Sequence, residues 1–421
     1  MSPTRRAFVA ALLACSLVAC RAAPQAPPPH PPARPILILI SIDGFRWDYL
    51  DRFNPPTLTQ LANDGVRADG LIPEFPSKTF PNHYTIVTGL RLEHHGIISN
   101  NMRDKDIPGQ FSLGNRAVQS DPRWWGGEPI WNTAEQQGMK AGAMFWPGSE
   151  AVINGRQATY WTPFDDNMRN SARVARVLGW LKLPDGERPS FLTLYFSDVD
   201  NAGHSRGPDS EEVKQAVLTV DNEIRDLVAG VKAAGLSDYV HYVIVSDHGM
   251  AAVSRDRLIV LDDYVDVQQM DVVDWSPVLT LSARNGDNEK LYAALRDKHP
   301  ALAVYRNSEL PEEHHLAGHP RLPAVIGIAS EGWSITSRRN LRRWLETKAR
   351  GVSGGEHGYA ASAPSMQGLF IAHGPRIRRG MRVKPFENIH IYEFMCAVLG
   401  LQPAKNDGDP AVTRDMLLPA Q

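Results

Sequence analysis

Acidic and histidine residues that could bind metal ions occur in short clusters far apart in the chain. The candidate ligands are Asp43, Asp200, His204, Asp247, His248 and His357. Carboxylate and imidazole ligands without a thiolate favour Zn²⁺, Mn²⁺ or Fe in a hydrolytic site over a structural zinc of the cysteine type. The set is large enough for two divalent cations, so the sequence predicts metal-assisted hydrolysis.

Three of these carboxylates follow apolar runs that are typical of buried strands. Asp43 comes directly after the run 36–42, and Asp247 comes directly after the run 239–246. Asp200 lies shortly after a third such run. In open α/β sheets, ligands gather at the carboxyl ends of the strands. We therefore expect the three carboxylates to meet at one edge of a sheet, although they are distant in sequence.

The apolar runs alternate with helical patterns along the chain. Strands are expected at residues 36–42, 141–146, 191–197, 239–246 and 368–372, and helices at 56–64, 80–88, 171–181, 210–234 and 388–399. Asp221, within the helix 210–234, is expected on an exposed face. This alternation predicts an α/β fold with a doubly wound sheet flanked by helices. Residues 253–351 differ, because two strand patterns and one helix pattern there predict a small α+β insertion. The catalytic domain would then comprise residues 36–252 and 352–405.

Thr79 stands at the expected start of the helix that runs to Thr88. Backbone N–H groups and the positive end of the helix dipole at such a position favour an anion. A hydroxyl beside a metal ion can ionise near neutral pH and attack phosphorus. A lone threonine here is more often a plain N-cap residue, but the metal-ligand clusters elsewhere in the chain favour a nucleophile.

The N-terminus has the pattern of an export signal, which we place at residues 1–19. An arginine pair precedes an apolar stretch that is too short to span a bilayer as a permanent helix. Cys20 follows a lipobox-like sequence and is a candidate for lipid attachment, the alternative being an ordinary cleaved signal with a chance cysteine. Residues 20–35 are rich in proline and predict an extended tether. The expected location is periplasmic.

The net charge of −2 gives the chain no general attraction to nucleic acid or to a membrane surface. Any recognition of phosphate must therefore be local, from metal ions and a few hydrogen-bond donors. A disulfide framework is excluded, because Cys396 is the one thiol after Cys20 and lies in an apolar helical pattern.

Eight sequence blocks carry a resemblance to a known family. They are residues 41–46, 76–84, 86–89, 95–100, 145–150, 200–204, 246–250 and 355–359. In this order they resemble the bacterial nucleotide pyrophosphatase/phosphodiesterase family, which belongs to the alkaline phosphatase superfamily. The resemblance covers nearly all of the chain from Pro35 to about Leu401. The chain departs from the family at Ala360, where an acidic or amide residue is frequent, and this bears on metal orientation nearby.

The resemblance implies two zinc ions, with Mn²⁺ as an alternative that the ligand types suit equally. One ion would be held by Asp200, His204 and His357. The other would be held by Asp43, Asp247 and His248, and it would also bind and activate Thr79. Asn100 would donate its amide to a phosphate oxygen. A phospho-threonine intermediate would form and then be hydrolysed.

Aromatic side chains predict where the rest of a diester substrate binds. Phe80 directly follows the candidate nucleophile. The resemblance implies that an aromatic ring at Phe164 stacks with Phe80 on a nucleobase, an interaction worth about 1–3 kcal/mol per base. Tyr160 is a further candidate contact, with a place in a core as its alternative.

The first functional hypothesis is a hydrolase of nucleotide 5′-phosphodiester and pyrophosphate bonds that releases nucleoside 5′-monophosphates. Two alternatives use the same scaffold, namely a phosphomonoesterase and a diesterase for choline-type head groups. A monoesterase needs extra positive donors for the doubly charged phosphate, and Thr79 has no arginine near it in sequence. A non-catalytic, lipid-anchored nucleotide-binding protein is the alternative from another class.

Overall fold

The computed structural model describes residues 34–347 and 354–419. The predicted export signal at 1–19, Cys20 and most of the tether at 20–35 lie outside these residues. Within them, every helix is too short or too polar to cross a membrane.

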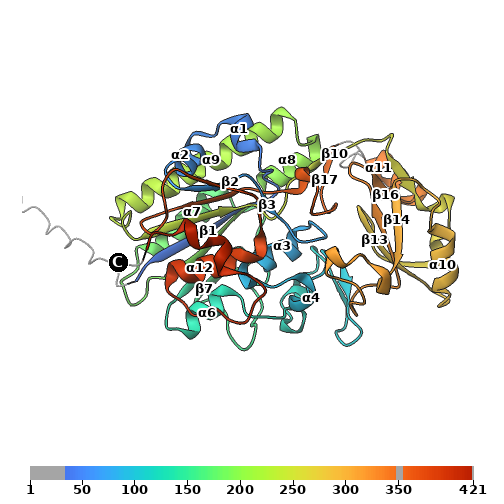
Figure 1. Cartoon of the computed structure of the whole chain (residues 1–421), viewed down its shortest axis with the longest axis horizontal. Coiled ribbons are helices and arrows are strands. Elements are labelled where there is room, and N and C mark those ends of the chain that lie inside the picture. The colour runs from blue at the N-terminus through green and yellow to red at the C-terminus, as the bar shows by residue number, and fades with distance from the viewer. Residues whose placement is uncertain (1–33, 348–353, 420–421) are drawn as a thin grey trace, which may run out of the picture. The chain divides into compact units, whose positions relative to one another are not determined.

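Among the described residues, the largest sheet has eight strands in the order β19-β2-β18-β9-β1-β8-β6-β7 (Figure 1). Their bounds are β1 Ile36–Ile42, β2 Val66–Ala68, β6 Ala141–Met144, β7 Tyr160–Thr162, β8 Phe191–Phe196, β9 Val240–Val245, β18 Phe370–His373 and β19 Met381–Val383. The five neighbours from β9 to β7 are mutually parallel. Strand β18 pairs antiparallel with β9 and with β2, so the sheet is mixed.

Strand β1 lies between two hydrophobic layers, which explains its uninterrupted apolar sequence. Leu37 and Leu39 belong to one core cluster, and Ile38 and Ile40 belong to another. Successive side chains of a strand point to opposite faces. Both faces of the sheet are therefore covered, as the sequence predicts for a doubly wound arrangement.

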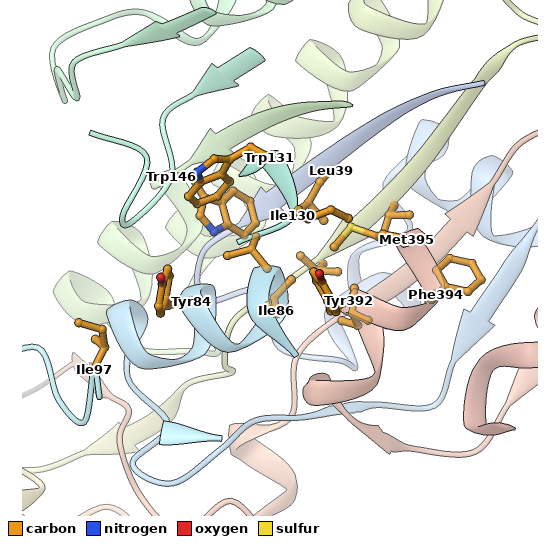
Figure 2. Packing of buried hydrophobic residues seen from close by; sticks show 14 of the residues in the cluster. Leu39, Tyr84, Ile86, Ile97, Ile130, Trp131, Trp146, Tyr392, Phe394 and Met395 are labelled. Atoms are coloured by element: carbon orange, nitrogen blue, oxygen red, sulfur yellow. The ribbon is translucent and has the colours of Figure 1, made fainter. Parts of the chain in front are cut away.

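Several helices contribute to each layer. The first layer includes α3 Thr79–Thr88, α6 Ile130–Gln136 and α12 Ile391–Leu399 (Figure 2). Figure 2 shows Ile86, Trp131 and Met395 from these helices packed near Leu39. The second layer includes α2 Pro56–Asn63, α7 Asn170–Leu181 and α9 Glu211–Ala233. Apart from α6, which has no counterpart among the expected helices, these bounds agree with the prediction to within a few residues.

The prediction that Asp221 lies on an exposed helix face is wrong. It is buried, and its carboxylate accepts hydrogen bonds from the main-chain N–H groups of Thr57 and Leu58 at 3.1 and 2.7 Å. Since the first N–H groups of a helix lack partners within the helix, Asp221 of α9 caps the start of α2.

Residues between β9 and β18 form a second, four-stranded sheet in the order β12-β13-β15-β14 (Figure 1, yellow to orange). Its strands are β12 Met270–Asp274, β13 Val278–Ala283, β14 Leu302–Arg306 and β15 Val325–Ala329, and α10 Asn288–Leu295 packs with them. A third core cluster includes Leu279, Leu281 and Leu291 from this part, together with Tyr359. The domain limits 253 and 351 stay a prediction.

The remaining helices and strands are α1 Tyr49–Phe53, β3 Leu71–Ile72, α4 Leu92–His95, β4 Met102–Arg103, β5 Gln110–Phe111, α5 Arg116–Gln119, α8 Asp198–Arg206, β10 Ala251–Val253, β11 Leu258–Val260, β16 Ser334–Thr336, α11 Arg338–Thr347, β17 Gly354–Glu356, β20 Phe386–Glu387 and α13 Pro410–Thr413. Among them, α8 directly follows β8, and β17 pairs antiparallel with β10. Both elements lie next to candidate metal ligands.

Candidate metal centre and active site

The three predicted carboxylates lie at the ends of three adjacent strands. Asp43 follows β1, Asp247 follows β9, and Asp200 is in the first turn of α8 after β8. Strands β9, β1 and β8 are neighbours and run parallel. Their carboxyl ends therefore meet at one edge of the sheet, and this brings the three carboxylates together.

His204 and His357 both turn their Nε2 atoms toward Asp200. These atoms lie 3.3 and 3.7 Å from Asp200 Oδ1. The Nδ1 of His204 lies 2.9 Å from the carbonyl oxygen of Gly355, and that of His357 lies 2.9 Å from the carbonyl oxygen of Ser77. A carbonyl oxygen only accepts, so each Nδ1 carries the proton and each Nε2 presents a lone pair. This arrangement could hold one metal ion.

His248 turns its Nε2 toward the other two carboxylates. That atom lies 3.4 Å from Asp43 Oδ1 and 3.0 Å from Asp247 Oδ2. Its Nδ1 lies 2.9 Å from the carbonyl oxygen of Gly249, which again leaves Nε2 free to bind a cation. Asp43, Asp200 and His248 can also share an ion. The two groups therefore adjoin, as they do in sites where two cations act on one phosphate.

His83 is a further residue beside these ligands that the sequence pattern did not single out. Its Nδ1 lies 2.8 Å from the carbonyl oxygen of Thr79 and 3.2 Å from Asp247 Oδ2. Its Nε2 lies 2.7 Å from Ser41 Oγ. Because neighbouring protein atoms engage both ring nitrogens, we interpret His83 as a support for Thr79 and Asp247 and not as a ligand.

The donor set fits a bound cation. Three buried carboxylate oxygens have no hydrogen-bond partner among the described residues, namely Asp43 Oδ1, Asp200 Oδ1 and Asp247 Oδ2. Burial, and then repulsion by Asp247 and Asp200, raises the pKa of Asp43 well above its usual value. Unpaired buried oxygens of this kind are costly, and divalent cations bound in the two adjoining groups would satisfy them.

Thr79 lies beside this cluster at the first position of α3. Its hydroxyl Oγ1 is 3.3 Å from His248 Nε2, and the side chain is half-buried at the wall of a cavity. At the start of α3, Phe80 donates its N–H to Asn100 Oδ1, Pro81 has no N–H, and Asn82 donates to the carbonyl oxygen of Lys78. The N–H of Thr79 is the one left for an anion at this helix start. The hydroxyl is therefore within reach of an anionic group held by the cluster.

Asn100 is held next to Thr79 by the main chain of Phe80. Its side-chain oxygen Oδ1 accepts a hydrogen bond from the Phe80 N–H at 2.9 Å. This contact fixes which end of the amide faces Phe80. The NH₂ group of Asn100 is thus turned away from the Phe80 N–H, and its predicted role as a donor to phosphate stays a prediction.

A cavity of about 240 Å³ opens from the cluster, and Asp43, Thr79, Phe80, Phe164 and Asp200 line it. Phe80 packs edge-on against Phe111, with ring centroids 5.6 Å apart. Phe164 packs edge-on against Phe145 at 5.1 Å and remains 38% exposed. Two of the three predicted aromatic contacts therefore border the same space.

Tyr160 is the third, and the structure places it outside this cavity. Its ring stacks on Trp180 with centroids 6.0 Å apart, and its hydroxyl donates to the carbonyl oxygen of Glu187 at 3.0 Å. Tyr160 lies on β7, which is the edge strand of the large sheet. The cavity is lined by other residues, so we withdraw Tyr160 from the candidate substrate contacts.

Two further features of the site, besides His83, were missed by sequence reasoning. The Tyr195 hydroxyl donates to Asp43 Oδ2 at 2.7 Å and thereby orients a candidate ligand. Arg116 pairs with Glu150, and its guanidinium lies 5.6 Å from the centre of the Phe164 ring. A half-buried tyrosine on β8 and an ion pair between α5 and a separate loop carry no local signal in the sequence.

The fold and the site together define an α/β protein of the alkaline phosphatase type with a metal-binding cluster at the strand ends. The family model described as type I phosphodiesterase / nucleotide pyrophosphatase matches residues 37–360. The chain belongs to this family.

Curated relatives agree with this assignment. The chain is 38% identical over 383 residues to venom phosphodiesterase CdcPDE of Crotalus durissus collilineatus, covering 88% of this chain and 45% of that protein. It is 36% identical over 399 residues to ectonucleotide pyrophosphatase/phosphodiesterase family member 3 of Mus musculus, covering 91% and 44%. The chain therefore spans less than half the length of these relatives.

Solved structures of the family superpose well. Murine ectonucleotide pyrophosphatase / phosphodiesterase 5 matches with a TM-score of 0.85 and 32% identity, covering 91% of this chain and 100% of that one. An inactive threonine-to-alanine variant of the same murine protein, in complex with AMP, matches with the same values.

Proposed function

We propose that this chain hydrolyses nucleotide 5′-phosphodiester and pyrophosphate bonds and releases nucleoside 5′-monophosphates. The observation that carries the proposal is the position of Thr79. Its hydroxyl stands at a helix start, 3.3 Å from His248 Nε2, in a cavity that the two phenylalanine rings also border. The murine relative that was solved with AMP is an inactive threonine-to-alanine variant, which supports a threonine nucleophile and a nucleotide ligand.

The reaction would proceed in two displacements at phosphorus. In the first, the Thr79 hydroxyl loses its proton and bonds to phosphorus, while the bond from phosphorus to the leaving oxygen breaks and that oxygen is protonated. In the second, water attacks the phospho-threonine, the bond from Oγ1 to phosphorus breaks, and the threonine hydroxyl is restored. The Asn100 amide and the Thr79 N–H at the start of α3 would donate to the phosphate oxygens in both steps.

Two divalent cations would occupy the site, and we propose Zn²⁺, with Mn²⁺ as the alternative that the ligand types allow. One would bind Asp200, His204 and His357. The other would bind Asp43, Asp247 and His248. When bound, such a pair lowers the pKa of a neighbouring hydroxyl and neutralises charge on the phosphate. Ala360, the departure from the family pattern, lies in a turn in which its carbonyl oxygen accepts from the Ala363 N–H.

Phe80 and Phe164 would hold the nucleobase, and Arg116 would keep the Phe164 ring in place. Lys78 does not supply positive charge to the phosphate, because its ammonium group is paired with Asp274. This disfavours a monoesterase, which needs extra cationic donors near the nucleophile.

The decisive experiment compares p-nitrophenyl thymidine 5′-monophosphate with p-nitrophenyl phosphate, each with and without a chelator. The proposal expects turnover of the diester that exceeds that of the monoester and disappears with the chelator. Preference for the monoester would reject the diesterase assignment. Binding of nucleotide without turnover of either substrate, in metal-loaded protein, would favour the non-catalytic alternative.

We further propose that the protein is exported and periplasmic, with a lipid on Cys20. The support is the sequence pattern of residues 1–20. Labelling of cells with a fatty-acid analogue, compared between the wild type and Cys20→Ser, tests the lipid directly. Equal labelling of the two proteins would reject it.

A further inference from the structure

A buried carboxylate of the second sheet connects the two segments that carry Thr79 and Asn100. Asp274 is the last residue of β12 and is 6% exposed. Its Oδ2 accepts from Lys78 Nζ at 2.7 Å and from Ser99 Oγ at 2.6 Å. Its Oδ1 accepts from Asn101 Nδ2 at 3.2 Å. Nothing in the proposed chemistry uses this group, although three side chains donate to it.

The donors of Asp274 flank the two catalytic candidates in sequence. Lys78 immediately precedes Thr79, while Ser99 and Asn101 lie on either side of Asn100. The hydrogen bond from the Phe80 N–H to Asn100 Oδ1 joins the same two segments on their other side. A closed ring of contacts results, and it leaves the Thr79 hydroxyl little freedom to move relative to the Asn100 amide.

The chain beyond Asp274 also packs against this part of the site. Gly358 follows the candidate ligand His357, and its backbone has φ +111°. A Cβ atom at Gly358 would lie 2.8 Å from Pro277 Cδ and 3.1 Å from Lys78 Cε. The stem of Lys78 is therefore enclosed between Pro277 of the second sheet region and the loop that carries His357.

We propose that Asp274 is a positioning residue, through which the second sheet fixes the Thr79 hydroxyl and the Asn100 amide in one geometry. This inference rests on the proposed function, because Asp274 would position two groups that act on phosphate without touching the phosphate itself. The ion pair with Lys78 is almost fully buried. Removing one partner of such a pair leaves an unpaired group with no water to compensate it, so the geometry should loosen.

The test compares Asp274→Asn with Asp271→Asn as a matched control. Asp271 lies on the same strand, and its carboxylate pairs with Arg103 at 2.5 Å in an exposed position, with the Asp271 side chain 39% and the Arg103 side chain 43% exposed. Asp274→Asn should lower kcat for p-nitrophenyl thymidine 5′-monophosphate by about 100-fold, since a misplacement of about 1 Å can cost that much. Its KM and metal content should stay near those of the wild type. Asp271→Asn should change neither kcat nor KM.

A double-variant cycle separates positioning from a general loss of stability. Lys78→Met should lower kcat as Asp274→Asn does, and the double variant should lose little more than either single variant, because both changes break one interaction. Ser99→Ala removes one hydrogen-bond donor to Asp274 and leaves the ion pair with Lys78 intact. It tests the same proposal if Asp274→Asn or Lys78→Met does not fold. It should reduce kcat by a smaller factor with an unchanged thermal midpoint.

Hydrogen exchange gives a readout that does not depend on turnover. Asp274→Asn should speed amide exchange in residues 76–82 and 98–102 together, and Asp271→Asn should speed neither segment. Wild-type activity on the diester tests the proposed function by itself. If Asp274→Asn leaves kcat and the exchange of both segments unchanged, or if Asp271→Asn reproduces its effects, Asp274 does not position the site.

Discussion

The Nε2 atoms of His204 and His357 face each other at 3.1 Å. Both rings hold an Nδ1 proton on a main-chain carbonyl oxygen, so both facing nitrogens present lone pairs. Burial lowers the pKa of His357 well below its usual value, and the neighbouring His248 and His204 lower it further. Two lone pairs this close, beside an unpartnered oxygen of Asp200, are stabilised when a cation lies between them.

Removal of metal should therefore destabilise the folded protein as well as abolish turnover. A ligand that binds only the folded state adds about 2.7 kcal/mol to the free energy of unfolding when its free concentration is about 100 times its dissociation constant. We expect chelation to lower the thermal midpoint measurably and Zn²⁺ or Mn²⁺ to restore it. His357→Ala should lose one of two metal equivalents, measured by elemental analysis. Full metal content in that variant would contradict the ligand assignment.

Thr79→Ala should remove nearly all turnover of a nucleotide diester, with kcat reduced at least about 1000-fold as is usual when a nucleophile is deleted. Metal content should remain near normal, because the carboxylates and imidazoles supply most of the ligands. Thr79→Ser keeps a hydroxyl at the start of α3 and should retain a measurable fraction of activity. Comparable turnover in the alanine variant would point to direct attack by water.

The sequence predicted those features of the site that follow from the pattern within a single strand or helix. Asp43 and Asp247 each follow a long apolar strand, so their meeting at the sheet edge could be predicted without knowing any tertiary contact. The bond from Tyr195 to Asp43 and the pairing of Lys78 with Asp274 join segments more than a hundred residues apart. Such pairings depend on how elements pack, and single residues do not signal them.

The burial of Asp221 and the orientation of Tyr160 also depend on how the elements pack, so the sequence did not predict them. Asp221 lies on a helix whose pattern predicts exposure at that position, yet the adjacent start of α2 supplies two N–H donors that make its burial favourable. Tyr160 lies only four residues before Phe164, but the edge strand β7 directs its ring to Trp180 and away from the cavity. Proximity in sequence to a substrate contact did not predict proximity in space.

The nucleobase site can be tested through Phe164. Its ring is the exposed aromatic surface that borders the cavity, and stacking on such a ring is worth about 1–3 kcal/mol by alanine substitution. Phe164→Ala should raise KM for nucleotide diesters by roughly 5- to 150-fold, which is that energy range expressed as a ratio. Hydrolysis of bis-p-nitrophenyl phosphate, which has no nucleobase, should change much less.

Tyr160→Ala provides the comparison within the same segment. Because its ring packs on Trp180, we expect a lower thermal stability with KM for nucleotides unchanged. An increase in KM that matches the one for Phe164→Ala would return Tyr160 to the substrate site.

His95 should make the fold sensitive to acid. The side chain is fully buried, and burial lowers its pKa to about 3 from an ordinary value of 6.5, with smaller contributions from His319 and Arg321. Its Nδ1 accepts from the Ile97 N–H at 3.1 Å, and Nε2 lies 2.9 Å from the Thr85 hydroxyl. The neutral ring satisfies both contacts, and a proton on Nδ1 would break the first.

Between pH 6.5 and about 3, the unfolded chain binds a proton at His95 and the folded chain does not. The contribution of His95 to stability is therefore complete above pH 6.5 and is lost as the pH falls, by up to about 1.4 kcal/mol per pH unit. Urea unfolding between pH 7.5 and 4.5 should show this slope in the wild type and a shallower one in His95→Gln. Since residues 96–100 lead from His95 to Asn100, diester hydrolysis should fail over the same range. Equal slopes in the two proteins would assign the acid sensitivity to other groups.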